Sequence, residues 1–284
     1  MIKDLPKFIF RIITSLLLGS LFIYSVIGNK YLFYLLVISF QVISVIELRR
    51  IFPNIIDPIL WISLTLWIDG IVLIYLYKYE LISNLSYFNY SIAFPFILSI
   101  IIVMLIMIIK NIMNSKEFNN EIVLDKIVKE FFLFFYFIGA LTLSFILFEI
   151  KNGLLLLLIV VTNYSHDIFA YFVGKTVGKT PFFNNISPSK TFEGYLGGVL
   201  FSIIIGVILA DKLDLFTLGQ YKILAIIITI AFLCAFGDLF ESLIKRVTNI
   251  KESGKIILGH GGVLDRIDSL VFSIFLSTTI YFLI

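Results

Sequence analysis

Nine long apolar runs constrain the fold of this chain more than any other feature of its sequence. A helix that crosses the hydrocarbon core of a bilayer needs about 20 mostly apolar residues. The runs approach that length, although the second and the seventh are short. They are continuous rather than alternating, which disfavours a closed β-barrel. Only 14% of the residues are charged, whereas soluble domains carry about 25%. We therefore expect an all-α, polytopic transmembrane helix bundle with spans at Phe8–Ile27, Tyr31–Leu48, Ile55–Tyr77, Tyr90–Ile109, Ile127–Phe148, Leu154–Val173, Tyr195–Ala210, Tyr221–Phe240 and Ile267–Ile284.

The positive charges indicate how these spans are oriented. If the N-terminus is cytoplasmic and the spans alternate, 17 Lys and Arg residues fall on the cytoplasmic side and 5 on the other. Cytoplasmic loops carry such an excess, so the split supports both the span count and a cytoplasmic N-terminus. Met1–Arg11 carries three positive charges before the first apolar run, as a signal peptide would. No small-residue cleavage site is evident near Ile27–Lys30, and more spans follow, so we expect a retained first helix. Two long polar loops, Gly174–Gly194 and Glu241–Asp265, are then cytoplasmic.

The first polar cluster begins inside the sixth expected span. His166 and Asp167 lie there among apolar neighbours, and a carboxylate at membrane depth is a functional candidate because it is costly to bury. A structural pair that bonds to a neighbouring helix is the alternative. Lys175, Lys179 and Lys190 follow among glycines, a combination that suits a phosphate ligand but also an ordinary positively charged loop.

The segment "SPSKTFEG" has the composition of a helix start. Ser187 is the expected N-cap, Pro188 the first helical residue, and Glu193 lies later in the opening turns. Helix N-termini bind anions, so capping and phosphate binding are compatible there.

The second polar cluster joins the last two expected spans. Helical spacing places four polar residues on one face at the end of the eighth span, and two aspartates open the ninth. Magnesium takes one or two carboxylates together with water and substrate phosphate oxygens. The cluster therefore favours a metal-dependent enzyme of phosphate chemistry, with a transporter for an anionic solute, coupled through His166 and Asp167, as the alternative. The residues are Asp238, Glu241, Ser242, Lys245, Asp265 and Asp268.

These residues closely resemble the signature of phosphatidate cytidylyltransferases, also called CDP-diacylglycerol synthases. The N-terminal half matches that family only as generic membrane spans. The downstream match comprises Ser242, Lys245, Arg246, Lys251, Glu252, Gly254, Gly259, His260, Gly261, Gly262, Asp265, Arg266 and Asp268; the upstream match comprises Asp167, Ala170, Tyr171, Gly174, Ser187, Pro188, Lys190, Thr191, Glu193, Gly194, Gly197 and Gly198.

Four positions depart from the family pattern. Glu252 stands where the family usually has Asp, Leu258 stands where Pro is common, and Ile168 and Phe169 replace small residues. None of these changes removes a charge, so they bear on the geometry of the site more than on the reaction.

The resemblance implies that CTP and phosphatidate give CDP-diacylglycerol and pyrophosphate, at the inner face of a bacterial cytoplasmic membrane. It implies dependence on Mg²⁺, held by Asp238 and Asp265, and leaves a second cation open. It also implies an N-terminal region of about five spans, residues 1–150, and a catalytic region with both cytoplasmic loops, residues 151–284. A homodimer is compatible with it. The implied catalytic residues are Asp238, Asp265, Lys245, Arg266 and His260; the implied substrate-binding residues are Asp167, Ser187, Lys190, Thr191, Glu193, Ser242, Arg246, Lys251, Gly261, Gly262 and Asp268.

Two rival functions and two further acidic residues complete the expectations from sequence. A CDP-alcohol phosphotransferase would need an Asp-Gly-x-x-Ala-Arg motif, which is absent. A transporter would show repeated halves with broken helices, and no convincing repeat is evident. Nothing indicates nucleic-acid binding. We expect Asp69 and Glu149 to be structural. The single cysteine, Cys234, excludes an intramolecular disulfide and a cysteine-cluster zinc site, and its apolar surroundings predict a small buried hydrophobe.

Overall fold

The structure is a computed structural model that describes residues 5–82, 88–114, 120–183, 187, 190–250, 252–254, 256–257 and 261–284. Helices dominate these ranges, and no β-strand occurs in them, which confirms the all-α class. The helices are α1 (Leu5–Gly28), α2 (Lys30–Ile51), α3 (Pro58–Ile82), α4 (Phe88–Asn114), α5 (Asn120–Leu133), the π-helical segment η2 (Phe134–Gly139), α6 (Ala140–Glu149), α7 (Leu154–Val177), α8 (Phe192–Lys212), the short 3₁₀ helix η3 (Leu215–Leu218), α9 (Gln220–Val247) and α10 (Leu264–Leu283).

Each expected span corresponds to a helix, with α5, η2 and α6 continuous as the fifth. Within the described residues, seven helices are long and apolar enough to cross a membrane, so the chain is a polytopic membrane bundle. Shorter apolar helices cover Leu16–Gly28 and Ser99–Met113. The count of nine spans and the cytoplasmic N-terminus therefore stay predictions.

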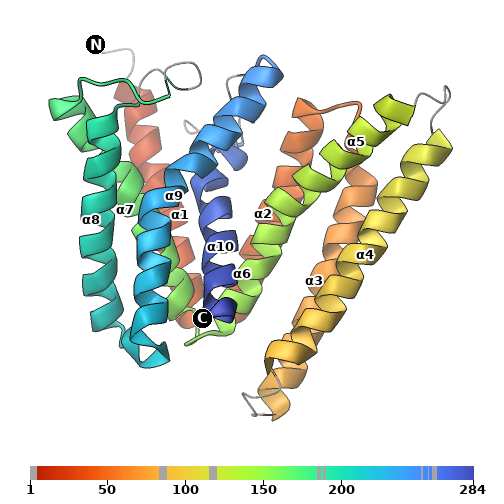
Figure 1. The fold of residues 1–284 in the computed structure, drawn as a ribbon, viewed down its shortest axis with the longest axis horizontal. Coiled ribbons are helices and arrows are strands. Elements are labelled where there is room, and N and C mark those ends of the chain that lie inside the picture. Colours follow the sequence, from red (N-terminus) through yellow and green to blue (C-terminus); the bar gives the residue numbers. More distant parts are fainter. Residues whose placement is uncertain are drawn as a thin grey trace. The chain divides into compact units, whose positions relative to one another are not determined.

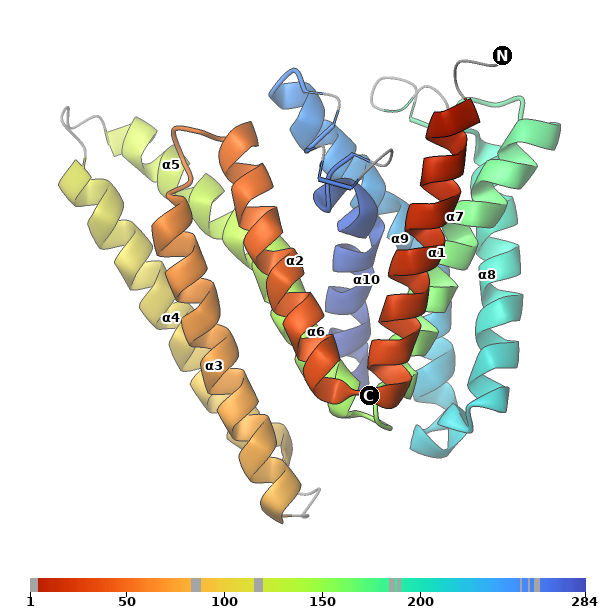
Figure 2. The same ribbon diagram turned by 180° about the vertical axis from the view of Figure 1, so that it is seen from behind.

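The chain packs as two compact units, one formed by residues 1–36 with 147–284 and the other by residues 37–146. In the first unit, α7 contacts α1, α8, α9 and α10, so it is the central helix (Figure 1). In the view from behind, α1 lies in front of α7 (Figure 2). All the predicted site residues that the structure describes belong to this first unit.

Close approach of α8 to α7 depends on small residues at the contact, as is common between helices in membranes. A side-chain carbon added at Gly198 would lie 2.8 Å from ring atoms of His166. One added at Gly197 would lie 2.6 Å from a methyl group of Val173. The glycines that the sequence places after the first polar loop therefore let α8 pack directly on the part of α7 that carries His166 and Asp167.

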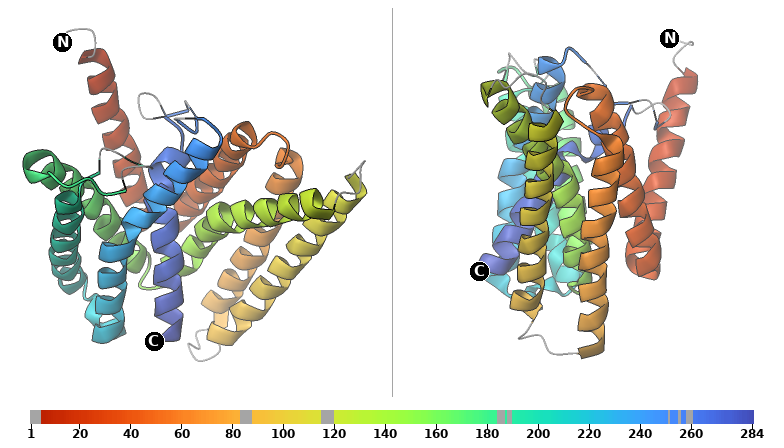
Figure 3. Two further views of the ribbon diagram at one scale, coloured as in Figure 1. Left: turned by 45° about the horizontal axis from the view of Figure 1, so that its top comes forward. Right: turned by 90° about the vertical axis from the view of Figure 1, so that its right-hand side faces the viewer.

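The same end of the first unit holds both polar connections. The α7–α8 connection, the α9–α10 connection and the N-terminal end of α1 lie together at that end, and the C-terminus lies at the other (Figures 1 and 3). This agrees with the expectation that both loops share one side of the membrane.

The start of α8 differs from its prediction. Thr191, rather than Ser187, is the N-cap: its backbone is extended, and its Oγ1 accepts a hydrogen bond from the Gly194 N–H at 3.2 Å. Ser187 lies in a turn, where its carbonyl accepts from the Lys190 N–H at 3.2 Å. The helix begins after the turn because the threonine is the residue whose side chain reaches the free N–H groups of the first turn.

The second unit has its own buried polar contacts. Thr142 donates to Asp69 at 2.8 Å, and Gln41 donates to both. In the first unit, Glu149 accepts a hydrogen bond from the Tyr34 hydroxyl. Asp69 and Glu149 are thus held by side chains of neighbouring helices, which is the structural role expected of them.

Candidate active site

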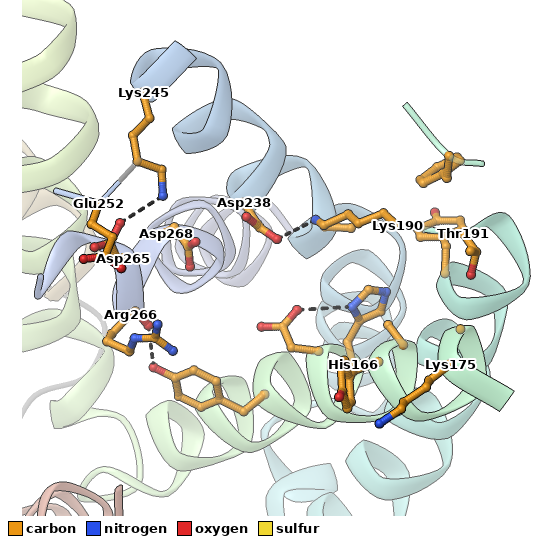
Figure 4. A pocket seen from close by; sticks show the side chains of 18 residues that line it. His166, Lys175, Lys190, Thr191, Asp238, Lys245, Glu252, Asp265, Arg266 and Asp268 are labelled. Carbon is orange, nitrogen blue, oxygen red and sulfur yellow. Dashed lines mark hydrogen bonds and ion pairs between the residues drawn. The ribbon is translucent and has the colours of Figure 1, made fainter. Parts of the chain in front are cut away.

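A cavity of about 1170 Å³ lies at the loop end of the first unit, and Figure 4 shows the side chains that line it. Its walls come from α7, the α7–α8 connection, the start of α8, the end of α9 and the start of α10. The two polar clusters of the sequence therefore meet in one place. The predicted site residues among its lining are Asp167, Lys190, Thr191, Asp238, Lys245, Asp265, Arg266 and Asp268.

Three carboxylates lie close together in this cavity region. Asp238 and Glu241 stand one turn apart on α9, and Asp268 comes from the first turns of α10. One oxygen of each lies within 4.8 Å of the others. Glu241 is only 2% exposed, and its Oε1 has no hydrogen-bond partner. Carboxylates this close repel one another unless a cation or a proton lies between them.

The donor set of this cluster suits a hard divalent cation. It offers oxygen ligands alone, which magnesium and calcium prefer. The unpartnered Oε1 of Glu241 is an acceptor that a cation would satisfy. The residues present therefore fit a magnesium ion at Asp238, Glu241 and Asp268.

Asp265 occupies a different position. Its carboxylate accepts hydrogen bonds from the backbone N–H groups of Ser253 at 3.0 Å and Gly262 at 2.9 Å. Lys245 lies 2.9 Å from Asp265 and 2.5 Å from Glu241, so it joins Asp265 to the carboxylate cluster. Gly261 has φ +87°, and a side-chain carbon there would lie 2.7 Å from the Asp265 carboxylate. Asp265 thus organises the α9–α10 connection from the first turn of α10.

The two residues that the resemblance implies as metal ligands have different surroundings. Asp238 lies beside Glu241 and Asp268 in the carboxylate cluster, whereas Asp265 contacts that cluster through Lys245. The metal pair of Asp238 and Asp265 therefore stays a prediction, and Glu241 is a further candidate ligand that the geometry adds. Because Glu241 follows Asp238 by one helical turn, the spacing on α9 contained the signal for it.

Lys190 reaches across the cavity from the α7–α8 connection to the opposite wall (Figure 4). Its Nζ lies 2.5 Å from Asp238 Oδ2, and about a quarter of its side chain is exposed. A lysine ammonium group on a flexible stem can exchange one anion for another. A phosphate entering the cavity would therefore compete with Asp238 for it.

Asp167 is fixed at the cavity wall by a chain of hydrogen bonds between α7 and α10, of which the two farther from Asp167 are buried. Ser273 donates to Asn163 at 2.6 Å, Asn163 donates to Ser269 at 2.8 Å, and Ser269 donates to Asp167 at 3.0 Å. Neither Asn163 nor Ser269 is among the residues predicted from the sequence. Asn163 lies one turn before Asp167 on the same helix face, which is the signal that could have found it.

The remaining predicted residues have diverse positions. The Glu193 carboxylate accepts hydrogen bonds from the backbone N–H groups of Lys179 and Thr180, at 3.1 Å each, and so ties the loop to α8. Ser242 donates to Asp238 at 3.4 Å. Arg246 is exposed at the end of α9, outside the cavity lining. Lys251 and His260 lie outside the described residues.

Three aromatic residues that were not predicted from the sequence also line the cavity. Phe182 stacks on Tyr195 with ring centroids 4.9 Å apart, and both belong to the lining. The Tyr164 hydroxyl donates to the Arg266 carbonyl at 2.9 Å. The cavity therefore combines a group of carboxylates, lysine ammonium groups and aromatic rings, which suits an anionic ligand with a planar ring.

Comparisons with known proteins agree with this chemistry. A family model described as the cytidylyltransferase family matches residues 9–284. The phosphatidate cytidylyltransferase of Bacillus subtilis is 32% identical over 275 residues, 92% of this chain and 93% of that protein. Those of Helicobacter pylori and Aquifex aeolicus are 44% identical over 129 residues and 40% identical over 152 residues. These two matches cover 45% and 53% of this chain, and the chain spans about half the length of each relative, 46% and 55%.

Proposed function

This chain belongs to the cytidylyltransferase family, and we propose that it transfers the cytidylyl group of CTP to phosphatidate, giving CDP-diacylglycerol and pyrophosphate. One observation carries the proposal most directly. Three carboxylates and two lysines, from the ends of apolar helices and the loop between two of them, converge on a single cavity region. A reaction between a nucleoside triphosphate and a membrane lipid needs that combination, because one substrate is polyanionic and the other is held in the bilayer.

In the proposed reaction a phosphate oxygen of phosphatidate attacks the α-phosphorus of CTP. The new P–O bond forms as the bond between that phosphorus and the oxygen bridging to the β-phosphate breaks, and pyrophosphate leaves with that oxygen. The attacking phosphate is a monoester that is already ionised near neutral pH, so no side chain needs to remove a proton from it. Catalysis then depends on positioning and on neutralising negative charge.

Asp238, Glu241 and Asp268 would hold the divalent cation. When bound, Mg²⁺ would neutralise charge on the triphosphate and on the transition state. Lys190 would leave Asp238 and bind a phosphate oxygen, which frees Asp238 for the cation at the moment the substrate enters. Lys245, held between Glu241 and Asp265, would keep the α9–α10 connection in place beside the carboxylate cluster.

Arg266 and the α9–α10 connection would bind phosphate groups. Arg266 lines the cavity and is exposed, and a guanidinium group binds two phosphate oxygens at once. We assign it to the lipid phosphate or to the leaving pyrophosphate. For His260 we propose a role in binding or positioning the nucleotide rather than that of a general base, because the attacking phosphate carries little proton to remove.

The bundle itself explains how the lipid would reach the cavity. Tyr171 and Phe172 near the loop end of α7 are exposed, as are Phe192 and Leu196 at the start of α8. Such surfaces suit a bilayer, where the acyl chains would stay while the phosphate enters the cavity. Extracting the chains would cost about 0.8 kcal/mol per CH₂ group. We propose that the cavity faces the cytoplasm of a bacterium.

The direct test is an assay of the purified, detergent-solubilised protein with radiolabelled CTP, phosphatidate and Mg²⁺. We expect a labelled liponucleotide and stoichiometric pyrophosphate, both abolished by omission of the lipid. The control is the same assay with diacylglycerol, which lacks the attacking phosphate. A protein that makes no liponucleotide but moves labelled anions into proteoliposomes would be a transporter, and the proposal would fail.

A further inference from the structure

A second group of side chains with metal-ligand atoms lies at the wall of the cavity and shares no residue with the carboxylate cluster. His166 and Asp167 come from α7, and Cys234 comes from α9. One donor atom of each lies within 4.8 Å of the other two. His166 is 2% exposed and Cys234 is fully buried, whereas the Asp167 side chain is 40% exposed and faces the cavity. We propose that these three residues form a binding site for a borderline-soft divalent cation such as Zn²⁺, separate from the magnesium-type site.

The first reason is that the buried ring of His166 lacks hydrogen-bond partners. Neither ring nitrogen has a hydrogen-bond partner, although the ring is almost completely buried. A buried polar group without a partner is costly, typically by about 1–3 kcal/mol. A cation at one nitrogen would remove that cost.

Packing decides which nitrogen points to the site. Nε2 lies on the side of the ring where α8 passes, since a carbon added at Gly198 would lie 2.8 Å from it. Nδ1 lies 3.5 Å from Asp167 Oδ1, beyond the range of a good hydrogen bond. The separation of two ligand atoms around a tetrahedral zinc ion is about 3.5 Å, given metal–ligand distances near 2.1 Å. Nδ1 and Oδ1 are therefore already spaced as ligands.

The second reason is that a hydrogen bond on one oxygen fixes the orientation of the Asp167 carboxylate. Its Oδ2 accepts the hydrogen bond of Ser269, the last link of the chain from Ser273 through Asn163. Metal-binding carboxylates are commonly fixed by such partners, and losing one typically lowers metal affinity by about 10–100-fold. The hydrogen bond of Ser269 occupies Oδ2 of Asp167 and leaves its Oδ1 toward His166.

The ligand chemistry separates this site from the other. Nitrogen, oxygen and sulfur together favour Zn²⁺, Co²⁺ or Cd²⁺, whereas carboxylates alone favour Mg²⁺. Binding would release the thiol proton of Cys234 to solvent, because the thiolate is the ligand. Three protein ligands leave the fourth position of a tetrahedral ion open, and the exposed Asp167 side chain puts that position toward the cavity.

An ion there would reduce the activity, a consequence that rests on the proposed function. Asp167 would be engaged by the metal, and the open coordination position would capture a phosphate oxygen away from the carboxylate cluster. We expect Zn²⁺ to inhibit CDP-diacylglycerol formation in the presence of excess Mg²⁺.

The test of the site uses neither CTP nor lipid. The purified, chelator-treated protein is titrated with Co²⁺, and the thiolate-to-Co²⁺ charge-transfer absorption in the near-ultraviolet is followed. Cys234 is the only cysteine in the chain, so the band reports on one residue. We expect it to saturate at one equivalent in the wild type and in Asp238→Asn, which alters only the other cluster.

Two variants test the histidine ligand and the hydrogen bond that orients Asp167. His166→Ala and Ser269→Ala should each weaken the titration by roughly 10–100-fold, while eluting as the wild type does in gel filtration. Absence of the band from the folded wild-type protein would refute the site. A band of unchanged affinity in both variants would also refute it, since a thiol alone would then explain the binding.

The activity arm is separate. Cys234→Ser should keep the wild-type rate with Mg²⁺ and require at least about ten times more Zn²⁺ for inhibition. If Zn²⁺ inhibited Cys234→Ser and the wild type equally, the proposed inhibition through this site would be wrong. If the wild type were inactive but showed the charge-transfer band, the proposed function would be wrong and the metal site would remain supported.

Discussion

Two buried glutamates, one in each unit, have the same burial and opposite surroundings. Glu130 in the second unit is fully buried and accepts hydrogen bonds from Trp61 at 3.1 Å, Lys110 at 2.7 Å and Asn111 at 2.5 Å. Glu241 in the first unit is 2% exposed and has Lys245 as its ion-pair partner at 2.5 Å. Its Oε1 has no hydrogen-bond partner, and Asp238 and Asp268 crowd it.

The difference separates a structural acid from a functional one. Both carboxylate oxygens of Glu130 are satisfied by donors from neighbouring helices, so the group stabilises the packing of its unit. Glu241 lies among like charges and has an unused acceptor, an arrangement that costs stability unless a ligand joins it. Burial and a lysine partner are common to both glutamates. What distinguishes Glu241 is an unpartnered acceptor that lies among other carboxylates.

The largest effect should come from Asp238→Asn, which removes a charge from the cluster while keeping its shape. We expect the rate of CDP-diacylglycerol formation to fall by about a thousandfold, the scale of losing one electrostatic contributor to a transition state. The Mg²⁺ concentration for half-maximal rate should rise as well. Thermal unfolding in detergent should change little, because repulsion within the cluster is relieved.

Asp265→Asn distinguishes the geometric cluster from the implied metal pair. It should also lower the rate strongly, but by loosening the α9–α10 connection, so half-saturation by Mg²⁺ should stay near the wild-type value. Limited proteolysis between Lys245 and Asp265 should be faster than in the wild type. A rise in the Mg²⁺ requirement equal to that of Asp238→Asn would restore Asp265 as a direct metal ligand.

Glu130→Ala addresses the structural side of the comparison. Three donors would lose their acceptor, and we expect a loss of about 3 kcal/mol in unfolding free energy, seen as a lower melting temperature in detergent. The rate per folded molecule should stay within about twofold of the wild type, since packing changes away from a site act mainly on stability. A folded variant with a thousandfold slower rate would contradict the structural assignment.

Glu241→Gln is the matched change in the other unit. It should lower apparent Mg²⁺ affinity by roughly 10–100-fold and leave the melting temperature equal or higher. If it instead destabilised the protein as Glu130→Ala does, the two glutamates would have the same role and the comparison would collapse.

The fold class and most of the cavity could be predicted from the sequence because their signals are local. Continuous apolar runs define helices in a bilayer, and helical spacing alone puts Asp238, Glu241 and Lys245 on one face. The start of α8 was misplaced because two residues, Ser187 and Thr191, have the chemistry of an N-cap. Only the backbone path decides which hydroxyl reaches the free N–H groups.

The relations between helices could not be predicted from the sequence. The ion pair of Lys190 with Asp238 and the hydrogen-bond chain from Ser273 to Asp167 join segments separated by tens to more than a hundred residues. Whether Asp238 pairs with Asp265 or with Asp268 depends on the angle at which α10 begins, which composition does not encode. Cys234 was correctly predicted to be buried, but its neighbours His166 and Asp167 come from another helix.

The smallest effect on activity is expected from a change of Lys190, whose ammonium group contacts the carboxylate cluster at Asp238. Lys190→Met keeps the length and apolar stem of the side chain and removes the ammonium group that contacts Asp238 at 2.5 Å. Because that group would exchange Asp238 for a substrate phosphate, we expect KM for CTP to rise about tenfold, the value of one exposed charge-assisted contact of roughly 1.4 kcal/mol. The maximal rate should change less. Lys179→Met is the control, since Lys179 is in the same connection, exposed, and outside the cavity lining. Equal effects of the two changes would mean that the loop attracts CTP by its overall charge, and that Asp238 is not released to the cation by the arrival of the substrate.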